Sequence, residues 1–288
     1  MPVIDARGLV KEFRTPLSRA IVRAVRGLDL RVEPGRVFGL LGPNGSGKTT
    51  TILMLLGLLK PTSGRIEILG YPAGHKEARR ATGFLPEETR LYEFLTGAET
   101  LDFVGRLFSI PRAERRRRRD ELLQRTGMWE TRNRRLATYS KGMARRIGLA
   151  QALIAKPKLV VLDEPTSGLD PVGNREVRQL LREVAAEGAA VLLTSHILGD
   201  VAEVCDAIAI LHEGRKILEG DVAGLLADAR RLIWETDAVG EERRARIEAL
   251  LESEGVVLHR TAPPRATLEA LFFEALARDA RDVGGHKA

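Results

Sequence analysis

The sequence predicts an α/β protein whose mainly parallel β-sheet is covered by helices on both faces. Short apolar runs of strand length alternate with helical patterns in residues 36–85 and again in residues 159–218. One of these runs leads through a glycine-rich loop directly into a helix. Parallel strands need crossover connections, and the helices in those connections cover the faces of the sheet. The alternation of strands and helices is therefore the main basis for this fold class.

The rest of the chain divides by pattern. Residues 1–35 place apolar side chains at alternating positions, which is typical of short antiparallel strands. Residues 87–157 are rich in helical patterns, and the periodicity weakens beyond Gly220. We therefore expect one domain at residues 1–220, with a helical subdomain at about 87–157, and a carboxy-terminal extension of unknown role at residues 221–288.

The composition is that of a folded protein of 288 residues, with 44% hydrophobic and 30% charged side chains. The amino-terminal residues do not resemble a signal peptide, and no apolar run approaches the about 18 residues of a membrane span. We expect any membrane connection to come through another polypeptide. The single cysteine, Cys205, excludes an internal disulfide or a cysteine zinc site and favours a reducing cytoplasm. The net charge of +7 fits nucleic acid, an anionic membrane surface or simply an arginine-rich composition.

The glycine-rich loop has the pattern G-x-x-x-x-G-K-[ST], which holds nucleotide triphosphates. Its glycines let backbone N–H groups face phosphate oxygens, and the helix that follows directs its positive end at them. Lys48 is expected to reach the β- and γ-phosphates and Thr49 to bind Mg²⁺. The alternative is a glycine-rich turn with a chance lysine, which the preceding strand and following helix argue against. The candidate nucleotide contacts are Gly42, Pro43, Asn44, Gly45, Ser46, Gly47, Lys48, Thr49 and Thr50.

Two carboxylates follow a second apolar strand. Residues 159–162 form that strand, and Asp163 and Glu164 come directly after it. A carboxylate at a strand end beside a phosphate loop can hold Mg²⁺, and Asp163 is the candidate. Glu164 could polarise a water that faces the γ-phosphate. An acidic residue after an apolar strand is a weak signal alone, but the phosphate loop earlier in the chain strengthens it.

A second helix start lies between these elements, at Tyr139-Ser140-Lys141-Gly142-Met143. Ser140 is a reasonable N-cap, and Gly142 leaves the backbone open to an anion. From its own residues alone, the favoured interpretation of this segment is an ordinary capped helix.

Taken together, these motifs resemble the ATP-binding subunits of ABC transporters over roughly residues 3–220. The order is phosphate loop, helical insert, Ser-x-Gly segment, Asp-Glu strand end, Ser167-Gly168-Leu169-Asp170 and Thr194-Ser195-His196. The resemblance implies a RecA-like P-loop NTPase core with an antiparallel β subdomain and an α-helical subdomain. It also implies ATP and Mg²⁺ as cofactors and a head-to-tail pair of subunits that sandwich ATP.

The resemblance assigns further residues. Ser140 and Gly142 would contact the γ-phosphate bound to the opposite chain, and Asp170 would lie at the dimer seam. His196 would contact the γ-phosphate and join Lys48 and Glu164 as a catalytic residue. Phe13 resembles the aromatic residue that stacks on adenine, but it could equally be a core residue.

Two departures from the commonest family pattern stand out. The signature segment is Tyr-Ser-Lys-Gly-Met in place of Leu-Ser-Gly-Gly-Gln, and Glu87 occupies the place of a metal-contacting glutamine. Glu87 thus joins Thr49 and Asp163 as a metal candidate, with Glu88 a weaker choice, and its charge could alter affinity or pH dependence. Both departures resemble subunits of drug, antibiotic, sodium and copper-maturation exporters. Residues 267–272 also resemble a short Leu-Glu-x-x-Phe element of those subunits.

Two surface expectations concern the helical subdomain. Leu91, Tyr92, Phe94 and Leu95 are apolar for a loop, and the resemblance places a docking face for the membrane subunit here; core packing is the alternative for about half of them. The run Arg115–Arg119 is expected to be a solvated helix face.

The functional expectation is an ATPase subunit that powers transport, in the direction of export, through a separate polytopic membrane subunit. It would work as a pair, of two copies or with a related chain, and sit in the cytoplasm against the inner face of the cell membrane, with no nucleic acid partner. The alternative is a soluble ABC-type ATPase that acts on nucleic acid or ribosomes. The basic charge fits that alternative, but a second cassette, a coiled-coil insertion and zinc cysteines are absent from the sequence. An importer subunit is a third possibility.

Overall fold

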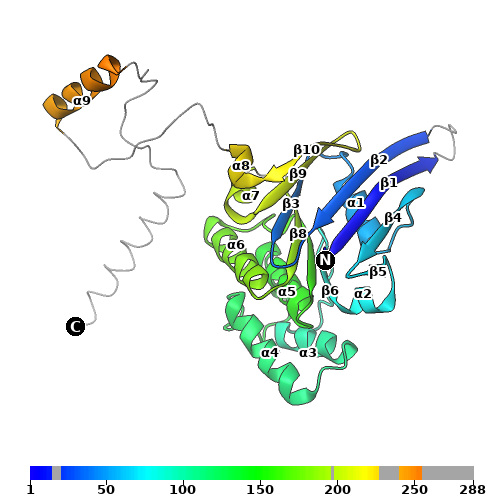
Figure 1. Cartoon of the computed structure of the whole chain (residues 1–288). Coiled ribbons are helices and arrows are strands. Elements are labelled where there is room, and N and C mark those ends of the chain that lie inside the picture. Colours follow the sequence, from blue (N-terminus) through cyan, green and yellow to red (C-terminus); the bar gives the residue numbers. More distant parts are fainter. Residues whose placement is uncertain (15–20, 196–197, 227–239, 255–288) are drawn as a thin grey trace, which may run out of the picture. The chain divides into compact units, whose positions relative to one another are not determined.

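The computed structural model describes residues 1–14, 21–195, 198–226 and 240–254 (Figure 1). The chain forms two compact units, residues 1–226 and residues 227–288. The boundary thus follows Leu226, slightly beyond the position expected from the sequence. In the second unit the described element is helix α9 (Glu241–Ser253), which follows Gly240 and has no buried residue.

The first unit contains a four-stranded antiparallel sheet in the order β2-β1-β4-β5. Its strands are β1 (Ile4–Arg14), β2 (Ile21–Val32), β4 (Ser63–Ile68) and β5 (Tyr71–Pro72). The alternating apolar pattern of the first 35 residues thus produces β1 and β2, whose register shifts mark local irregularities in their pairing. The two strands are longer than the short strands that the pattern predicts.

A six-stranded sheet has the order β10-β9-β3-β8-β7-β6. Its strands are β3 (Val37–Leu41), β6 (Thr82–Leu85), β7 (Leu159–Asp163), β8 (Ala190–Ser195), β9 (Ala207–His212) and β10 (Arg215–Asp221). All neighbouring pairs are parallel except β9 and β10. Every residue of β3, β7 and β8 is buried, as expected for central strands covered on both faces. The predicted mainly parallel sheet is confirmed.

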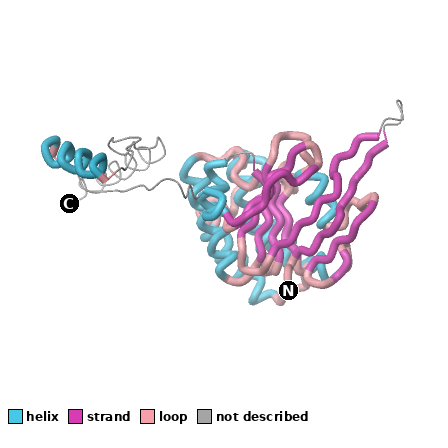
Figure 2. The backbone as a smooth tube through the Cα atoms, turned by 45° about the horizontal axis from the view of Figure 1, so that its top comes forward, coloured by secondary structure: helices cyan, strands magenta, loops and turns pink. Residues whose placement is uncertain are grey.

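Helices cover this sheet on both sides (Figures 1 and 2). The helices of the first unit are α1 (Lys48–Leu55), α2 (Lys76–Arg80), α3 (Gly97–Leu107), α4 (Arg112–Arg125), α5 (Lys141–Leu153), α6 (Pro171–Ala186), α7 (Leu198–Val204) and α8 (Val222–Leu226), with a 3₁₀ turn at Leu136–Thr138. Local sequence sets several helix starts. Thr96 and Glu99 form a capping box at α3, and Asp170 caps α6 with Pro171 as its first residue.

Two hydrophobic cores lie on opposite faces of the six-stranded sheet. Val160 and Leu162 of β7 pack with α5, α6 and the helices α3 and α4, whereas Leu159 and Val161 pack with α1 and the antiparallel sheet. Successive side chains of a strand point to opposite faces, so one short strand joins both cores. This packing fixes β7, and therefore the acidic residues at its carboxyl end, in the centre of the unit.

The arginine run in α4 differs from the expected solvated face. Arg116 and Arg117 are exposed, but Arg115 pairs with Asp102 of α3 at 2.5 Å and Arg118 pairs with Glu114 at 2.7 Å. Arg117 and then Arg118 lower the pKa of the Glu114 carboxyl to about 2 by hydrogen bonding. Arg115 therefore ties α4 to α3, whereas Arg118 pairs within α4. In the described part of the chain no helix combines the length and apolarity needed to cross a bilayer.

Candidate nucleotide-binding site

The phosphate loop leaves the buried strand β3 through glycines that no other residue can replace without a clash. Gly42 has a φ of 148°, and a Cβ there would lie 2.2 Å from the carbonyl oxygen of Leu211. Gly47 has a φ of 105°, and a Cβ there would lie 2.5 Å from the carbonyl oxygen of Ala24. The neighbouring strands therefore press directly on the loop backbone, which holds its N–H groups in a fixed curve.

Helix α1 begins at Lys48 with no side-chain cap on Gly47. The first N–H groups of a helix have no intrahelical acceptor, so this start offers uncapped donors beside the loop. The ammonium group of Lys48 donates to the carbonyls of Gly42 at 2.7 Å and Pro43 at 3.2 Å, inside the loop. The hydroxyl of Ser46 is buried without a hydrogen-bond partner. Donors gathered around a concave backbone fit the phosphates of a nucleotide.

Asp163 stands at the carboxyl end of β7, next to α1 and β8. Its Oδ2 accepts a hydrogen bond from Thr49 Oγ1 at 3.3 Å, and its Oδ1 accepts one from Thr194 Oγ1 at 2.5 Å. A hydroxyl and a carboxylate are oxygen ligands of the kind Mg²⁺ prefers, with phosphate and water oxygens completing its shell. Among the described residues no group of three or more acidic, histidine or cysteine side chains is placed so that it could hold a metal ion by itself. The donor set therefore fits a metal shared with a nucleotide.

Glu164, the next residue, is buried and has a φ of 53°. This left-handed conformation is uncommon for a residue with a side chain and is found where the surroundings enforce it. Here the N–H of Glu164 donates to Thr194 Oγ1 at 3.0 Å, so one hydroxyl links the backbone of Glu164 to the carboxylate of Asp163. Thr194 is opposite Asp163 in the β7–β8 register.

The place of Arg145 of α5, like that of Thr194, was not predicted from the sequence. Its side chain is buried, and among the described residues its guanidinium donates only to backbone carbonyls and one hydroxyl. The acceptors are the carbonyl oxygens of Pro86, Glu87, Asp163, Glu164 and Pro165 and the hydroxyl of Thr89. Burial lowers the pKa of Arg145, while the charges of Asp163, Glu87 and Glu164 oppose that effect.

The residues expected at a subunit seam lie near one another. Ser140 caps α5 by accepting from the N–H of Met143 at 3.2 Å, and Asp170 caps α6 by accepting from the N–H of Gly173 at 2.7 Å. A Cβ on Gly142 would lie 3.3 Å from the carbonyl of Gly168, so the start of α5 packs on the loop before α6. Within the described residues no hydrogen bond joins Ser140 or Gly142 to the phosphate loop.

Three further candidate site residues differ in their surroundings. Phe13 is 42% exposed, with Lys11 Nζ 5.1 Å from the ring centroid, so it is not a core residue. Glu87 has an exposed side chain, and its carbonyl accepts from Arg145 Nη1 at 2.9 Å. His196 lies outside the described residues, as does the 267–272 element.

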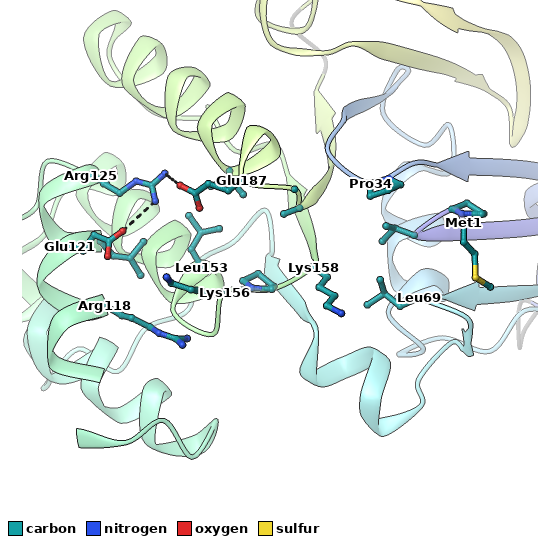
Figure 3. Close-up of a pocket in the computed structure, with 17 residues that line it drawn as sticks. Met1, Pro34, Leu69, Arg118, Glu121, Arg125, Leu153, Lys156, Lys158 and Glu187 are labelled. Carbon is teal, nitrogen blue, oxygen red and sulfur yellow. Dashed lines mark ion pairs between the residues drawn. The ribbon is translucent and has the colours of Figure 1, made fainter. Parts of the chain in front are cut away.

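A cavity of about 760 Å³ lies at the opposite, amino ends of β3, β7 and β8 (Figure 3). Arg125, on its wall, pairs with Glu121 at 3.7 Å and with Glu187 at 3.0 Å. Lys158 and Ala189 on its lining come just before or at the starts of β7 and β8, whereas Asp163 and the phosphate loop follow strand ends. The cavity is therefore separate from the candidate nucleotide site.

The fold and this loop define the class of protein: a P-loop nucleotide-binding protein with an acidic strand end beside the loop. A family model described as "ABC transporter" matches residues 25–167. A dimeric ATP-binding cassette solved in a post-hydrolysis state with ADP and Pi has a TM-score of 0.69 and 25% identity, over 76% of this chain and 98% of that chain. The chain belongs to the ATP-binding proteins of ABC transporters, a family of ATPases.

Its relatives include proteins named for drug resistance. The daunorubicin/doxorubicin resistance ATP-binding protein DrrA of Streptomyces peucetius is 38% identical over 266 residues, covering 91% of this chain and 79% of that protein. An uncharacterized ABC transporter ATP-binding protein of Synechocystis sp. is 43% identical over 229 residues, covering 78% of this chain. The match spans 65% of the Synechocystis protein, just under two thirds of its length.

Proposed function

We propose that this chain hydrolyses Mg²⁺–ATP as one of two paired ATPase subunits and thereby powers export through a separate membrane protein. The observation that carries the proposal is the tethering of Asp163 and Glu164 to one buried hydroxyl, Thr194, with Asp163 also bonded to Thr49 of α1. The carboxylate of Asp163, proposed to bind the metal, and the backbone of Glu164, whose carboxylate is proposed to polarise a water, are thereby held beside a phosphate loop, as hydrolysis of a nucleotide triphosphate requires.

The residues have separate roles in this proposal. Lys48 and the N–H groups at the start of α1 bind the phosphates, which accounts for the buried position of the lysine inside the loop. Thr49 and Asp163 hold Mg²⁺, with Glu87 as a further ligand. When bound, Mg²⁺ neutralises charge on the phosphates. Glu164 orients a water and accepts its proton, and His196 is proposed to contact the γ-phosphate.

Pairing of two subunits is the second part of the proposal. Ser140, Gly142 and Asp170 gather where α5 and α6 begin, and Ser140 and Asp170 are exposed. The start of α5, with the exposed hydroxyl of Ser140 and the open backbone at Gly142, offers an anion contact that no hydrogen bond among the described residues connects to the chain's own phosphate loop. We assign Ser140 and Gly142 to the nucleotide of a second subunit and Asp170 to the seam between the subunits. Phe13, exposed on β1, is assigned to adenine.

The membrane partner is proposed to dock on an aromatic patch formed by Tyr92, Phe94 and Phe103. Tyr92 and Phe94 are 57% and 69% exposed, and the ring of Tyr92 lies 5.8 Å from that of Phe94 and 5.9 Å from that of Phe103. Leu91 and Leu95 instead pack against the core. Exposed contiguous aromatic side chains favour a protein interface. Tyr92 and Phe94 lie five and seven residues after Glu87 in the sequence.

The direction of transport is inferred from relatives. DrrA is named a daunorubicin/doxorubicin resistance ATP-binding protein, and resistance is consistent with removal of a compound from the cell. Export would place this subunit at the inner face of the cell membrane, where ATP is available. The membrane protein, and not this chain, would determine which compound is exported.

Two measurements test the proposal. The purified chain is expected to release phosphate from ATP with Mg²⁺ and to lose this activity with EDTA. The chain, isolated from native membranes in detergent, is expected to bring a polytopic membrane protein in stoichiometric amount, identified by mass spectrometry. Recovery of ribosomal proteins or nucleic acid without a membrane protein would contradict the proposal and favour a soluble ATPase.

A surface variant sharpens the second measurement. Phe94→Ser is expected to reduce recovery of the membrane protein on the order of tenfold, because an exposed aromatic anchor is lost, and to leave basal ATPase activity unchanged. Leu58→Ser is the matched control, since Leu58 is similarly exposed but follows α1. Equal recovery from both variants would remove the patch from the docking surface.

A further inference from the structure

Arg145 connects α5 to the two loops that carry the acidic residues. Its Nη1 donates to the Pro86 and Glu87 carbonyls after β6, and its Nη2 donates to those of Asp163 and Glu164 after β7. Strands β6 and β7 are parallel neighbours, so their carboxyl ends lie side by side. One side chain, 3% exposed, thus spans both loops from a third element.

The charge of Arg145 is unusual for a buried group, because it forms no ion pair with any described residue. Its N–H donors are directed instead at neutral oxygen atoms, which satisfies their hydrogen bonding and leaves the positive charge without a contacting anion. A buried charge without a paired partner is costly. The negative charges of Asp163, Glu87 and Glu164 act on it from nearby and favour the protonated form.

The bond to Glu164 has a specific structural consequence. Glu164 is in the left-handed conformation, and both of its peptide groups are held: its N–H by Thr194 and its carbonyl by Arg145 Nη2 at 2.6 Å. A strained backbone persists only where its surroundings over-determine it. The N–H of Ser167 also donates to the Glu164 carbonyl, at 3.1 Å, so Arg145 supplies one of several restraints on the backbone that carries the Glu164 side chain.

The same cation also affects Glu87. A carboxylate at this position adds negative charge where the proposed function already places a triphosphate and Asp163. Arg145 is bonded to the carbonyl of Glu87 at 2.9 Å, so its charge moves with that residue. A fixed cation at this place offsets the added charge and lowers the penalty for bringing ATP beside Glu87.

We propose that Arg145 is a positioning residue for hydrolysis, which holds Glu164 in its left-handed backbone and offsets the negative charge of Glu87. The proposal rests on the proposed roles of Glu164 and Glu87 in the ATPase site. It links the start of α5, where Ser140 caps the helix, to the aim of the catalytic carboxylate in the same chain. A shift of α5 would therefore move Glu164 and the Glu87 loop together.

The first test measures steady-state ATP hydrolysis by the full chain with Arg145→Lys and Arg145→Met. We expect Arg145→Met to lower kcat about 10- to 100-fold, the usual effect of removing a positioning contact. KM for ATP should rise, because the charge offset at Glu87 is lost, but by a smaller factor than kcat falls, because the phosphate loop is untouched. Arg145→Lys keeps the charge but loses the fork of donors, so its kcat should lie between those of wild type and Arg145→Met.

The second test is a double-mutant cycle with Glu87→Gln. If Arg145 offsets the charge of Glu87, Arg145→Met should raise KM for ATP by a smaller factor in the Glu87→Gln background than in wild type. An equal rise in KM in the two backgrounds would overturn the charge-offset part of the proposal. Unchanged kcat in Arg145→Met would overturn the positioning part.

Controls separate this proposal from folding and from the proposed function. Arg118→Met removes another partly buried arginine, which donates to the carbonyl of Ile154 away from both loops, and should keep kcat within about twofold. If Arg145→Met does not fold, the kcat of Arg145→Lys tests the proposal instead. A wild-type kcat in Arg145→Lys would overturn the positioning role, because it would show that hydrolysis does not need the forked donors of arginine. Absence of Mg²⁺-dependent hydrolysis in the wild type would overturn both proposals. If the wild type hydrolyses ATP normally, the results for the Arg145 variants test the role of Arg145 alone.

Discussion

Charged side chains at the two ends of the six-stranded sheet are held by different kinds of partner. At the carboxyl ends, Asp163 and Arg145 are buried and bonded to hydroxyl or backbone groups. At the amino ends, Arg125 beside the cavity pairs with partly exposed glutamates, among them Glu187 at 3.0 Å (Figure 3) and Glu183 at 3.2 Å. Asp163 and Arg145 are thus held by buried hydroxyl and backbone groups, whereas Arg125 is held by exposed side chains that can change conformation.

This difference between the two ends indicates where activity and stability depend on the exact positions of charged groups. Exposed ion pairs contribute about 0–1 kcal/mol, because solvent already stabilises the separate charges. A buried polar group that loses its partner costs about 1–3 kcal/mol, and more when it is charged. We therefore expect substitutions at the carboxyl ends to change both activity and stability, and substitutions at the amino ends to change little.

The largest effect should come from Glu164→Gln. The amide keeps the size of the side chain but cannot accept a proton from water, so hydrolysis should fall on the order of 100-fold or more while ATP binding is retained. Phosphate release and equilibrium ATP binding measure the two outcomes. ATP-dependent pairing, followed by light scattering, should become more persistent because the nucleotide is no longer consumed.

Glu187→Gln is the matched control at the other end of the sheet. It makes the same chemical change on a carboxylate that pairs with Arg125, and turnover should be unaffected. Normal turnover in Glu164→Gln would contradict the assignment of Glu164 as the general base and would make the two ends equivalent.

An intermediate effect is expected from Thr194→Val. The substitution removes the hydroxyl that accepts from Glu164 N–H and donates to Asp163, leaving both buried groups without that partner. We expect a loss of about 1–3 kcal/mol in the free energy of unfolding and about a tenfold fall in kcat. Urea denaturation and ATPase assays measure these quantities. Thr194→Ser keeps the hydroxyl and should preserve most of both; a similar loss in Thr194→Ser would show that the methyl packing, not the hydrogen bonds, matters.

The smallest effect is expected from Arg125→Ala. Arg125 contacts three glutamates, but their side chains are partly exposed, so the loss should be about 1 kcal/mol or less, with a melting temperature lower by about 2–4 °C at most. Differential scanning calorimetry measures the shift, and kcat should stay at the wild-type value. A large fall in kcat would mean that the cavity end communicates with the nucleotide end.

Much of the fold could be predicted because its signals are local. The strand, loop and helix around Lys48 are contiguous in the chain, and the apolar run before Asp163 identifies a central strand. The mainly parallel sheet and the antiparallel strands of the first 35 residues follow from the same patterns and are confirmed. The roles of the individual site residues stay predictions until they are measured.

Residues that act across the fold could not be predicted in this way. Arg145 contacts backbone carbonyls of two loops, and backbone groups leave no mark on sequence composition. Likewise, Arg115 pairs with Asp102 on another helix. The sequence alone therefore predicts a solvated arginine run, because the pairing depends on how α3 and α4 pack together. Thr194 had a usable signal, because it is a hydroxyl residue near the end of an apolar strand, and the structure places it opposite Asp163.

At position 164, the left-handed backbone conformation gives folding stability and ATP turnover different residue requirements. Glycine adopts this conformation with little strain, so glutamate is not the residue that would make the loop most stable. A thermostability screen without an activity filter would therefore favour replacing the carboxylate. Selection for ATP hydrolysis would keep the glutamate there, and engineering efforts on this chain should hold position 164 fixed while they improve the rest.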